Sequence, residues 1–567
     1  MSTESFDAVI VGSGFGGSVM AYRLREAGLS VCLLERGKAY PPGSFPRSPH
    51  KMKQNFWDPS SGLYGMFDVW SFRGLGALIS SGLGGGSLIY ANVLLRKDEK
   101  WFVREDPREG TYEDWPVTRA DLEPHYDRAE KMLKAQVFPF EHAPYKDVPK
   151  TRAMQAAGKR LQQAHQGLKW GLPPLAVTFA NAGRPPVPGE PIEGGSDNLH
   201  GAARSTCRLC GECDIGCNYG SKNTLDFNYL SLASKLGADV RTRCEVRGFN
   251  PCDAGYEVSF VRHDASREGV PFDTRQLPLH RIACRRLILS AGALGTPFLL
   301  LKNRGHFPRI SPRLGSRFGG NGDLLTLVYK SCENGAGAPV PRVLDPSYGP
   351  VITSYLRIPD RVDGGTGPGF YVEDAGYPEF VNWMVQLAEA PTGVGRLLRF
   401  VSNWIERRLG LLSDSDISKD IADLFGDCAL SKSSLPLLGM GRDTPSGNMT
   451  LRDGYLDIDW RLRDSEEYFG RVRALMQDIA GALEAKFLDD PIWYLSRVIT
   501  VHPLGGAPMG RSAAEGVVDS KGEVFGYPGL HVADGAVMPG PVGPNPSLTI
   551  AALADRFADA IVAEERP

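Results

Sequence analysis

The chain has 567 residues, more than one hydrophobic core usually covers, so we expect at least two domains. Its formal net charge of -2 gives no electrostatic case for nucleic-acid binding, and no run of about 18 apolar residues predicts a membrane-spanning helix. The first residues lack the basic and apolar pattern of a signal peptide, so we expect a cytoplasmic protein.

The first predicted elements form a strand–helix–strand unit. An apolar strand is predicted over residues 6–11, because a short continuous apolar run is typical of a parallel strand buried on both faces. Residues 15–27 have helical composition and end at Gly28, and residues 30–34 form a second apolar run. This order predicts a nucleotide-binding βαβ unit.

Three glycines between the first strand and the helix have the G-x-G-x-x-G spacing. Gly12 permits a tight turn, Gly14 lets a pyrophosphate approach the backbone, and Gly17 lets helix and strand pack closely. Glu35 ends the second strand, where an acid binds ribose hydroxyls. The alternative is a glycine-rich turn without a ligand, and the unit alone does not distinguish NAD from FAD.

Glycine-rich segments recur later in the chain. Residues 71–93, SFRGLGALISSGLGGGSLIYANV, would let the backbone lie against a large ring system. Residues 284–297 form an apolar strand that ends in small residues. Within residues 530–550 an apolar strand ends at Asp534–Gly535, and a helix starts after Pro546. We therefore expect a discontinuous nucleotide domain that holds FAD.

Together these segments resemble the glucose-methanol-choline (GMC) oxidoreductase family and, within it, the cholesterol oxidase-like branch. The resemblance rests on GSGFGG, GLGGGSLIYANV, SKNTLDFNYL, SAGALGTP, VHPLGGAPMG and VADGAVMPGPVGPNPSLTIAALADR. It implies an α/β fold: a discontinuous Rossmann-type FAD-binding domain plus a substrate-binding domain with a mainly antiparallel sheet and covering helices. The implied FAD-binding domain comprises residues 1–100, 200–310 and 496–567, and the substrate-binding domain comprises 101–199 and 311–495.

The resemblance also implies the cofactor contacts. The implied FAD-binding residues are Gly12, Gly14, Gly17, Glu35, Gly85, Gly86, Ser87, Asn92, Val246, Asp534, Gly535 and Asn545.

Oxidation of an alcohol requires removal of the hydroxyl proton and transfer of a hydride from carbon. The flavin accepts the hydride, and a histidine suits the proton because imidazole titrates near neutral pH. The resemblance places this histidine at His502 in VHPLGG. Its partner is Asn545 in PNPSL, which would hydrogen-bond the substrate oxygen or the flavin. A glutamate on the substrate domain matches Glu373 in FYVEDAGYP as a second proton acceptor, with Asp374 as the alternative.

Four cysteines are close together in CRLCGECDIGC: Cys207, Cys210, Cys213 and Cys217. Their C-x₂-C-x₂-C-x₃-C spacing is that of ferredoxin cluster ligands, although Asn218 stands where proline usually follows. Some dehydrogenases of the family resemble this stretch in carrying a three-iron cluster there. An iron–sulfur cluster, zinc or another structural metal, and plain thiols or disulfides all remain open.

We therefore predict an FAD-dependent oxidoreductase for a lipophilic alcohol, with a 3β-hydroxysteroid as the leading substrate and a place in steroid and lipid metabolism. Oxygen or an external carrier would take the electrons. The alternatives are a dehydrogenase for a sugar or long-chain alkanol that passes electrons through a cluster, and a non-enzymatic flavin carrier. The carrier is disfavoured, because it needs no proton acceptor at His502.

Three further patterns fall in the predicted substrate-binding domain. Alternation over residues 436–460, around Asp453–Gly454, predicts a hairpin in the sheet over the flavin. Residues 466–486 predict an amphipathic helix. Residues 394–412 predict a helix with apolar and arginine-rich faces, which either packs on this domain or contacts an anionic membrane surface.

Overall fold

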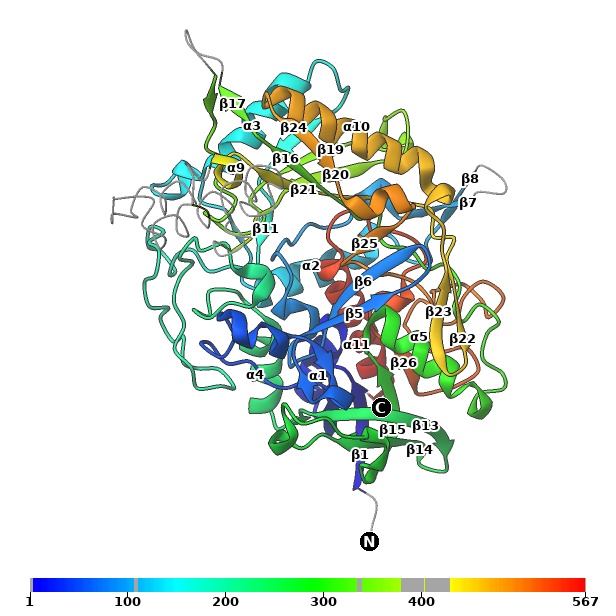
Figure 1. Cartoon of the computed structure of the whole chain (residues 1–567). Coiled ribbons are helices and arrows are strands. Elements are labelled where there is room, and N and C mark those ends of the chain that lie inside the picture. The colour runs from blue at the N-terminus through cyan, green and yellow to red at the C-terminus, as the bar shows by residue number, and fades with distance from the viewer. Residues whose placement is uncertain (1–3, 107–110, 334–338, 379–401, 403–428, 566–567) are drawn as a thin grey trace.

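The computed structural model of the protein describes residues 4–106, 111–333, 339–378, 402 and 429–565, and Figure 1 shows the arrangement of its elements. The first sheet lies toward the bottom of that view and the second toward the top.

The first sheet has seven strands in the order β12-β2-β1-β15-β14-β13, and β26 pairs with β15. The strands are β1 (Glu4–Val11), β2 (Val31–Leu34), β12 (Asp239–Arg241), β13 (Cys244–Cys252), β14 (Gly255–Arg262), β15 (Leu279–Leu289) and β26 (Leu530–Val532). The pairs among β12, β2, β1, β15 and β26 are parallel, whereas β13 and β14 are antiparallel neighbours.

The apolar runs of the sequence form the centre of this sheet. Residues 8–11 of β1 are buried because β1 lies between β2 and β15 and packs beneath helix α1 (Phe15–Glu26). Helix α1 also packs against α11 (Ser547–Glu565) and α4 (Tyr229–Lys235). The chain's first and last segments therefore share one core, as the predicted discontinuous Rossmann-type fold requires.

The second sheet has six strands in the order β10-β19-β20-β21-β16-β24, and each strand pairs antiparallel with its neighbours. The strands are β10 (Lys169–Gly171), β16 (Leu324–Tyr329), β19 (Tyr355–Ile358), β20 (Phe370–Asp374), β21 (Leu435–Gly441) and β24 (Lys486–Asp489). Helices α3 (Pro149–Leu161) and α10 (Glu466–Ala482) pack on this sheet. The predicted fold class is confirmed: an α/β nucleotide-binding unit with a second, antiparallel sheet under covering helices.

A three-stranded sheet lies between the two larger ones in Figure 1. It consists of β5 (Phe67–Ser71), β6 (Leu75–Ser80) and β25 (Val498–Thr500). Strand β25 runs parallel to β6 and ends two residues before His502. The sheet therefore delivers the predicted catalytic histidine to the region between the two main sheets.

The remaining elements are short or lie at the edges. The two-stranded pairs are β3 (Trp57–Asp58) with β4 (Leu63–Tyr64), β7 (Val103–Asp106) with β8 (Thr111–Asp114), β9 (Gln136–Val137) with β11 (Pro174–Leu175), β17 (Cys332–Glu333) with β18 (Val340–Pro341), and β22 (Asn448–Arg452) with β23 (Tyr455–Asp459). The described ranges also contain the α-helices α2 (Arg119–Met132), α5 (Gly292–Lys302) and α9 (Ala429–Lys432).

Both local elements predicted in the substrate-binding domain form, but one of them does not join the predicted sheet. The hairpin around Asp453–Gly454 forms as β22 and β23, and the helix predicted over 466–486 forms as α10. The hairpin is, however, a two-stranded sheet of its own, so its predicted membership in the sheet over the flavin is wrong. Turn residues act locally, whereas pairing with a third strand depends on distant segments.

The predicted domain division remains a prediction. Helix α2, at residues 119–132, packs against α11, and its buried Leu122 and Tyr126 belong to the core of the first sheet. Leu75 and Val498 belong to the core of the second sheet. Each core therefore contains residues from ranges that were predicted to belong to the other domain, so the chain passes between the two cores more often than the five predicted ranges imply.

The predicted helix over residues 394–412 lies outside the described residues, apart from Ser402. Within the part of the chain that is described, none of the helices combines the length and the apolar content needed to cross a membrane. Contact of the 394–412 segment with a membrane surface remains a prediction.

Candidate active site

The first glycine motif has the geometry that its spacing predicts. Gly12 has φ +98°, and a Cβ there would lie 2.3 Å from the carbonyl oxygen of Ser290. A Cβ on Gly17 would lie 2.0 Å from the carbonyl oxygen of Gly12. Gly14 differs, because a Cβ there would meet nothing within 4 Å. The backbone at the start of α1 is therefore open, which fits a phosphate at a helix N-terminus.

The carboxylate of Glu35 lies at the end of β2, beside this turn. Its Oε2 accepts hydrogen bonds from the amide of Ser13 at 3.0 Å and from the Ser13 hydroxyl at 2.5 Å, and its Oε1 accepts one from the amide of Gly37 at 2.8 Å. Glu35 is 5% exposed. The acid predicted to bind ribose is therefore fixed against the loop that would hold the phosphates.

Strand β13 passes the same corner of the site. The amide of Cys244 donates to the carbonyl oxygen of Glu35 at 2.8 Å. Val246 follows two residues later, is 8% exposed, and precedes a register shift in the pairing of β13 with β14. This position is compatible with the FAD contact that the family resemblance implies for Val246.

The second glycine segment packs on the first. A Cβ on Gly85 would lie 2.6 Å from Gly14 Cα, whereas a Cβ on Gly86 would meet nothing within 4 Å. The Ser87 hydroxyl donates to the carbonyl oxygen of Gly84 at 2.7 Å and accepts from the amide of Leu225 at 3.1 Å. Gly86 thus has open backbone, and Ser87 stabilises the turn that presents it.

The segment at Asp534–Gly535, which is predicted to contact FAD, lies next to the start of α1. Asp534 accepts hydrogen bonds from the amides of Ala536 and Gly292 at 2.8 and 2.9 Å and from the Thr296 hydroxyl at 2.5 Å. Burial raises the pKa of Asp534 to about 6. The carbonyl oxygen of Gly535 accepts from the amide of Gly505 at 2.9 Å, so this segment runs beside the chain that follows the predicted catalytic histidine.

Several buried polar atoms near these segments have no hydrogen-bond partner within the described residues. They include the hydroxyl of Tyr90 and both side-chain amide atoms of Asn92. Buried polar groups are rarely left unpaired in native proteins, so such atoms indicate a bound polar group. Together with the open backbone at Gly14 and Gly86, they fit the predicted FAD.

His502 is oriented by a carboxylate that the sequence analysis did not identify. Its Nδ1 lies 2.8 Å from Oδ1 of Asp323, whose side chain is 1% exposed. Its Nε2 is therefore the ring nitrogen left to face a substrate. The sequence signal for Asp323 is weak: a polar residue in the glycine-rich stretch FGGNGD, just before the apolar strand β16.

Glu373 and Asn545 meet directly. The Asn545 side-chain amide donates to Oε2 of Glu373 at 3.3 Å. Oε1 of Glu373 and Oδ1 of Asn545 are buried and have no partner among the described residues. Burial raises the pKa of Glu373 to about 8.

Asp374, the alternative to Glu373, is fully engaged elsewhere. Adjacent residues of a strand point to opposite faces, and Asp374 accepts hydrogen bonds from the amides of Thr353 and Ser354 at 3.0 and 2.5 Å. Its Oδ2 lies 3.4 Å from Nζ of Lys150. These contacts favour Glu373 as the site residue and give Asp374 a structural role.

The four clustered cysteines line one small pocket, together with Lys222 and Pro350. Backbone amides contact two of the sulfurs: Leu209 N–H donates to Sγ of Cys207 at 3.5 Å, and Ser221 N–H donates to Sγ of Cys217 at 3.3 Å. Burial raises the pKa of Cys210 to about 12 and that of Cys207 well above its ordinary value. No disulfide is present among the cysteines of the described ranges.

The ammonium group of Lys222 connects this pocket to the second glycine segment. Lys222 is 1% exposed, and its Nζ donates to the carbonyl oxygens of Leu88, Tyr90 and Cys213 at 3.1, 2.8 and 2.8 Å. The cysteine pocket therefore lies directly behind the segment predicted to contact the flavin.

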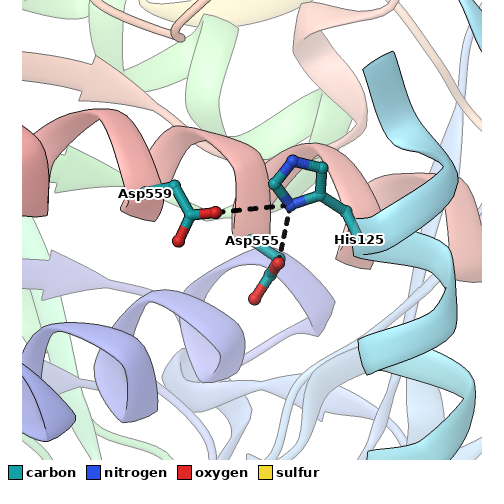
Figure 2. A group of neighbouring side chains, drawn as sticks. All are labelled: His125, Asp555 and Asp559. Atoms are coloured by element: carbon teal, nitrogen blue, oxygen red, sulfur yellow. Dashed lines mark hydrogen bonds and ion pairs between the residues drawn. The ribbon is translucent and has the colours of Figure 1, made fainter. Parts of the chain in front are cut away.

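Among the described residues, the potential ligand atoms of His125, Asp555 and Asp559 lie within 4.8 Å of one another (Figure 2). Two arginines already neutralise this group. Arg23 forms ion pairs with both aspartates, and Arg128 contacts Asp559 at 2.8 Å and donates to Asp555 at 2.7 Å. We assign this group to an ion-pair network that joins α1, α2 and α11.

Comparison with known proteins agrees with this geometry. Residues 443–554 match the family model described as GMC oxidoreductase, and residues 10–43 match an NAD(P)-binding Rossmann-like domain. A cholesterol oxidase from Mycobacterium tuberculosis is 31% identical over 98% of this chain and 90% of its own length. A cholesterol oxidase from Acinetobacter baumannii is 29% identical over 100% of this chain and 96% of its own length.

A solved structure shows the same fold with a different named substrate. The pyridoxine 4-oxidase from Mesorbium loti is 17% identical, with a TM-score of 0.54 over 98% of each chain. The chain belongs to the glucose-methanol-choline oxidoreductase family, as an FAD-dependent oxidoreductase that acts on CH–OH groups.

Proposed function

We propose that the protein oxidises the hydroxyl-bearing carbon of a lipophilic secondary alcohol to a ketone, and that a 3β-hydroxysteroid is the leading substrate. The observation that carries the proposal is the buried Glu373–Asn545 pair, each member of which has an oxygen without a partner among the described residues. Buried polar groups are rarely left unpaired, so two such atoms side by side suit a bound polar group such as a substrate hydroxyl. The names of the two cholesterol oxidase relatives support the steroid.

The residues have distinct roles in this proposal. FAD, when bound, supplies the hydride acceptor. Nε2 of His502 accepts the hydroxyl proton, because Nδ1 faces Asp323. The Asn545 amide nitrogen has a second N–H besides the one that it donates to Glu373, and this N–H donates to the substrate oxygen. Glu373, with a pKa of about 8, is mostly protonated at neutral pH, so it donates a hydrogen bond and accepts a proton only in its ionised fraction.

The FAD contacts in this proposal divide into three groups. Gly12, Gly14 and Gly17 shape the turn and the helix N-terminus for the phosphates, and Glu35 and Val246 face the ribose and adenine. The remaining FAD contacts are Gly85, Gly86, Ser87, Asn92, Asp534, Gly535 and Asn545.

Anaerobic titration of the oxidised flavin with candidate alcohols tests the substrate. Loss of the flavin absorbance with a 3β-hydroxysteroid supports the proposal. Loss only with a sugar or a long-chain alkanol would favour the alternative dehydrogenase, and this alternative stays open because the fold does not fix the substrate. No loss with any alcohol would leave a flavin carrier.

For electron transfer out of the flavin, we propose an iron–sulfur cluster held by Cys207, Cys210, Cys213 and Cys217. The four cysteines line one small pocket. Their spacing along the chain is that of ferredoxin cluster ligands, and thiolates are the ligands that iron–sulfur clusters use. A cluster, when bound, supplies a one-electron acceptor for the flavin. Oxygen would then be a poor electron acceptor for this enzyme.

Metal analysis tests the four cysteines without relying on activity. Protein purified anaerobically should contain iron and acid-labile sulfide and give an electron paramagnetic resonance signal. Cys213→Ser should lose iron, whereas Cys252→Ser, at an exposed cysteine outside the pocket, should keep it. Flavin-loaded protein without iron after reconstitution would rule out the cluster and favour oxygen as the acceptor.

A further inference from the structure

The loop at residues 319–323 contacts the chain next to both proposed catalytic residues. It leads into β16 of the second sheet, and Gly319 forms two backbone hydrogen bonds with Leu504, two residues after His502. The amide of Gly319 donates at 3.1 Å, and the amide of Leu504 donates at 3.0 Å.

Asp323 accepts four hydrogen bonds from three consecutive residues. Its Oδ2 accepts from the amides of Val501 and His502 at 2.8 and 3.1 Å and from the Thr500 hydroxyl at 2.9 Å. Its Oδ1 faces Nδ1 of His502 at 2.8 Å. A carboxylate with this many donors acts only as an acceptor, so Nδ1 carries the proton and Nε2 holds the free electron pair. Asp323 thus fixes the backbone, the ring orientation and the tautomer of His502.

Asn321 holds the backbone next to Asn545 in the same way. Its Oδ1 accepts from the amide of Gly543 at 2.9 Å, and its Nδ2 donates to the carbonyl oxygens of Gly543 and Pro544, both at 3.2 Å. Asn321 is fully buried and has φ +53°, a conformation that asparagine tolerates better than most residues. It therefore fixes the two residues that immediately precede Asn545.

The loop is itself anchored to the second sheet. The amide of Gly441, at the end of β21, donates to the carbonyl oxygen of Asn321 at 2.9 Å. The Tyr468 hydroxyl, from α10, donates to the carbonyl oxygen of Gly322 at 2.8 Å. The second sheet and helix α10, which packs on it, therefore fix the position of the loop.

We propose that Asn321 and Asp323 are paired positioning residues, which set Asn545 and His502 in one geometry for removal of the hydroxyl proton. The inference rests on the proposed roles of His502 and Asn545. It assigns a function to two residues of one loop that bind segments 179 and 222 positions away in the chain.

Stopped-flow measurement of flavin reduction by the alcohol tests the pairing, because it separates the limiting reduction rate from the substrate dissociation constant. Asp323→Asn should lower the limiting rate by about 10²- to 10⁴-fold, the range seen when a histidine base loses its orienting carboxylate. The dissociation constant and the FAD content should stay close to wild type. Asn321→Asp, which keeps the acceptor for Gly543 but loses the amide donor, should lower the rate less. Asp453→Asn, at an exposed turn, is the matched control.

Double variants exclude a merely structural effect. If Asp323 acts through His502, Asp323→Asn combined with His502→Gln should be no slower than His502→Gln alone. Multiplying effects, or a wild-type rate in Asp323→Asn, would overturn the proposal.

Nitrogen NMR of imidazole-labelled protein separates this inference from the proposed function. It should show the proton on Nδ1 of His502 in the wild type, and a changed tautomer in Asp323→Asn. If His502→Gln reduces flavin at the wild-type rate, the catalytic role of His502 is wrong. An unchanged tautomer in Asp323→Asn contradicts the role of Asp323 itself.

Discussion

The side-chain amide of Asn545 donates to Oε2 of Glu373 at 3.3 Å, and burial raises the pKa of Glu373 to about 8. The pair joins the last turn before α11 to β20 of the second sheet. Because burial raises the pKa of the Glu373 carboxyl group, the stability of the protein depends on pH.

Stability should therefore fall as the pH rises between about 4.5 and about 8. In this window the unfolded chain has released the Glu373 proton while the folded chain retains it, so deprotonation favours unfolding. One proton corresponds to at most about 1.4 kcal/mol per pH unit. Thermal unfolding at pH 5 and pH 8 should show a smaller decrease in Tm for Glu373→Gln than for the wild type. Equal decreases would contradict a raised pKa.

The first two glycines of the motif should respond differently to alanine. Gly14→Ala should fold normally, since a Cβ there meets no protein atom within 4 Å, but it should weaken FAD binding about tenfold or more, or roughly 1.4 kcal/mol, because the methyl group occupies the phosphate position. Gly12→Ala should lower the stability of the apoprotein itself, because its Cβ would lie 2.3 Å from Ser290 O. Fluorescence titration with FAD and apoprotein melting measure the two effects. Normal FAD affinity in Gly14→Ala would place the phosphates elsewhere.

His502→Gln should keep the yellow, FAD-bound protein but slow flavin reduction by about 10²- to 10⁴-fold, the usual contribution of a general base. His306→Gln, at an exposed histidine, is the matched control and should reduce flavin at the wild-type rate. Anaerobic stopped-flow absorbance measures both variants. A wild-type rate in His502→Gln would refute its role as proton acceptor.

Asp555→Asn should destabilise the protein by about 1.5–3 kcal/mol, because it removes the buried carboxylate that pairs with Arg23 and Arg128, while Asp559 still pairs with both arginines. The Asp555 side chain is 1% exposed, whereas that of Asp559 is 44% exposed, so Asp559→Asn should cost less. Denaturant titration gives both values. A rise in wild-type stability on adding a divalent metal would instead support a metal site at His125.

The sequence was sufficient where structure and function are encoded locally. The βαβ unit was predictable because its strand, glycine turn, helix and acid follow one another from β1 to Glu35. His502 and Asn545 can be proposed from the sequence because each lies in a short family motif.

Choosing between Glu373 and Asp374 required the structure. Neighbouring residues of a strand face opposite sides, and which side faces the site depends on the pairing of β20 with β19 and β21. Asn321 and Asp323 were missed for a related reason, because they contact residues 222 and 179 positions away and no local pattern indicates such contacts.

The most direct test of the account is single-turnover reduction of the flavin by a 3β-hydroxysteroid, under anaerobic conditions, with hydrogen or deuterium at the hydroxyl-bearing carbon. The account predicts complete loss of the oxidised flavin absorbance, and slower loss with deuterium, because the hydride leaves that carbon. A flavin that stays oxidised in the presence of the steroid would contradict it.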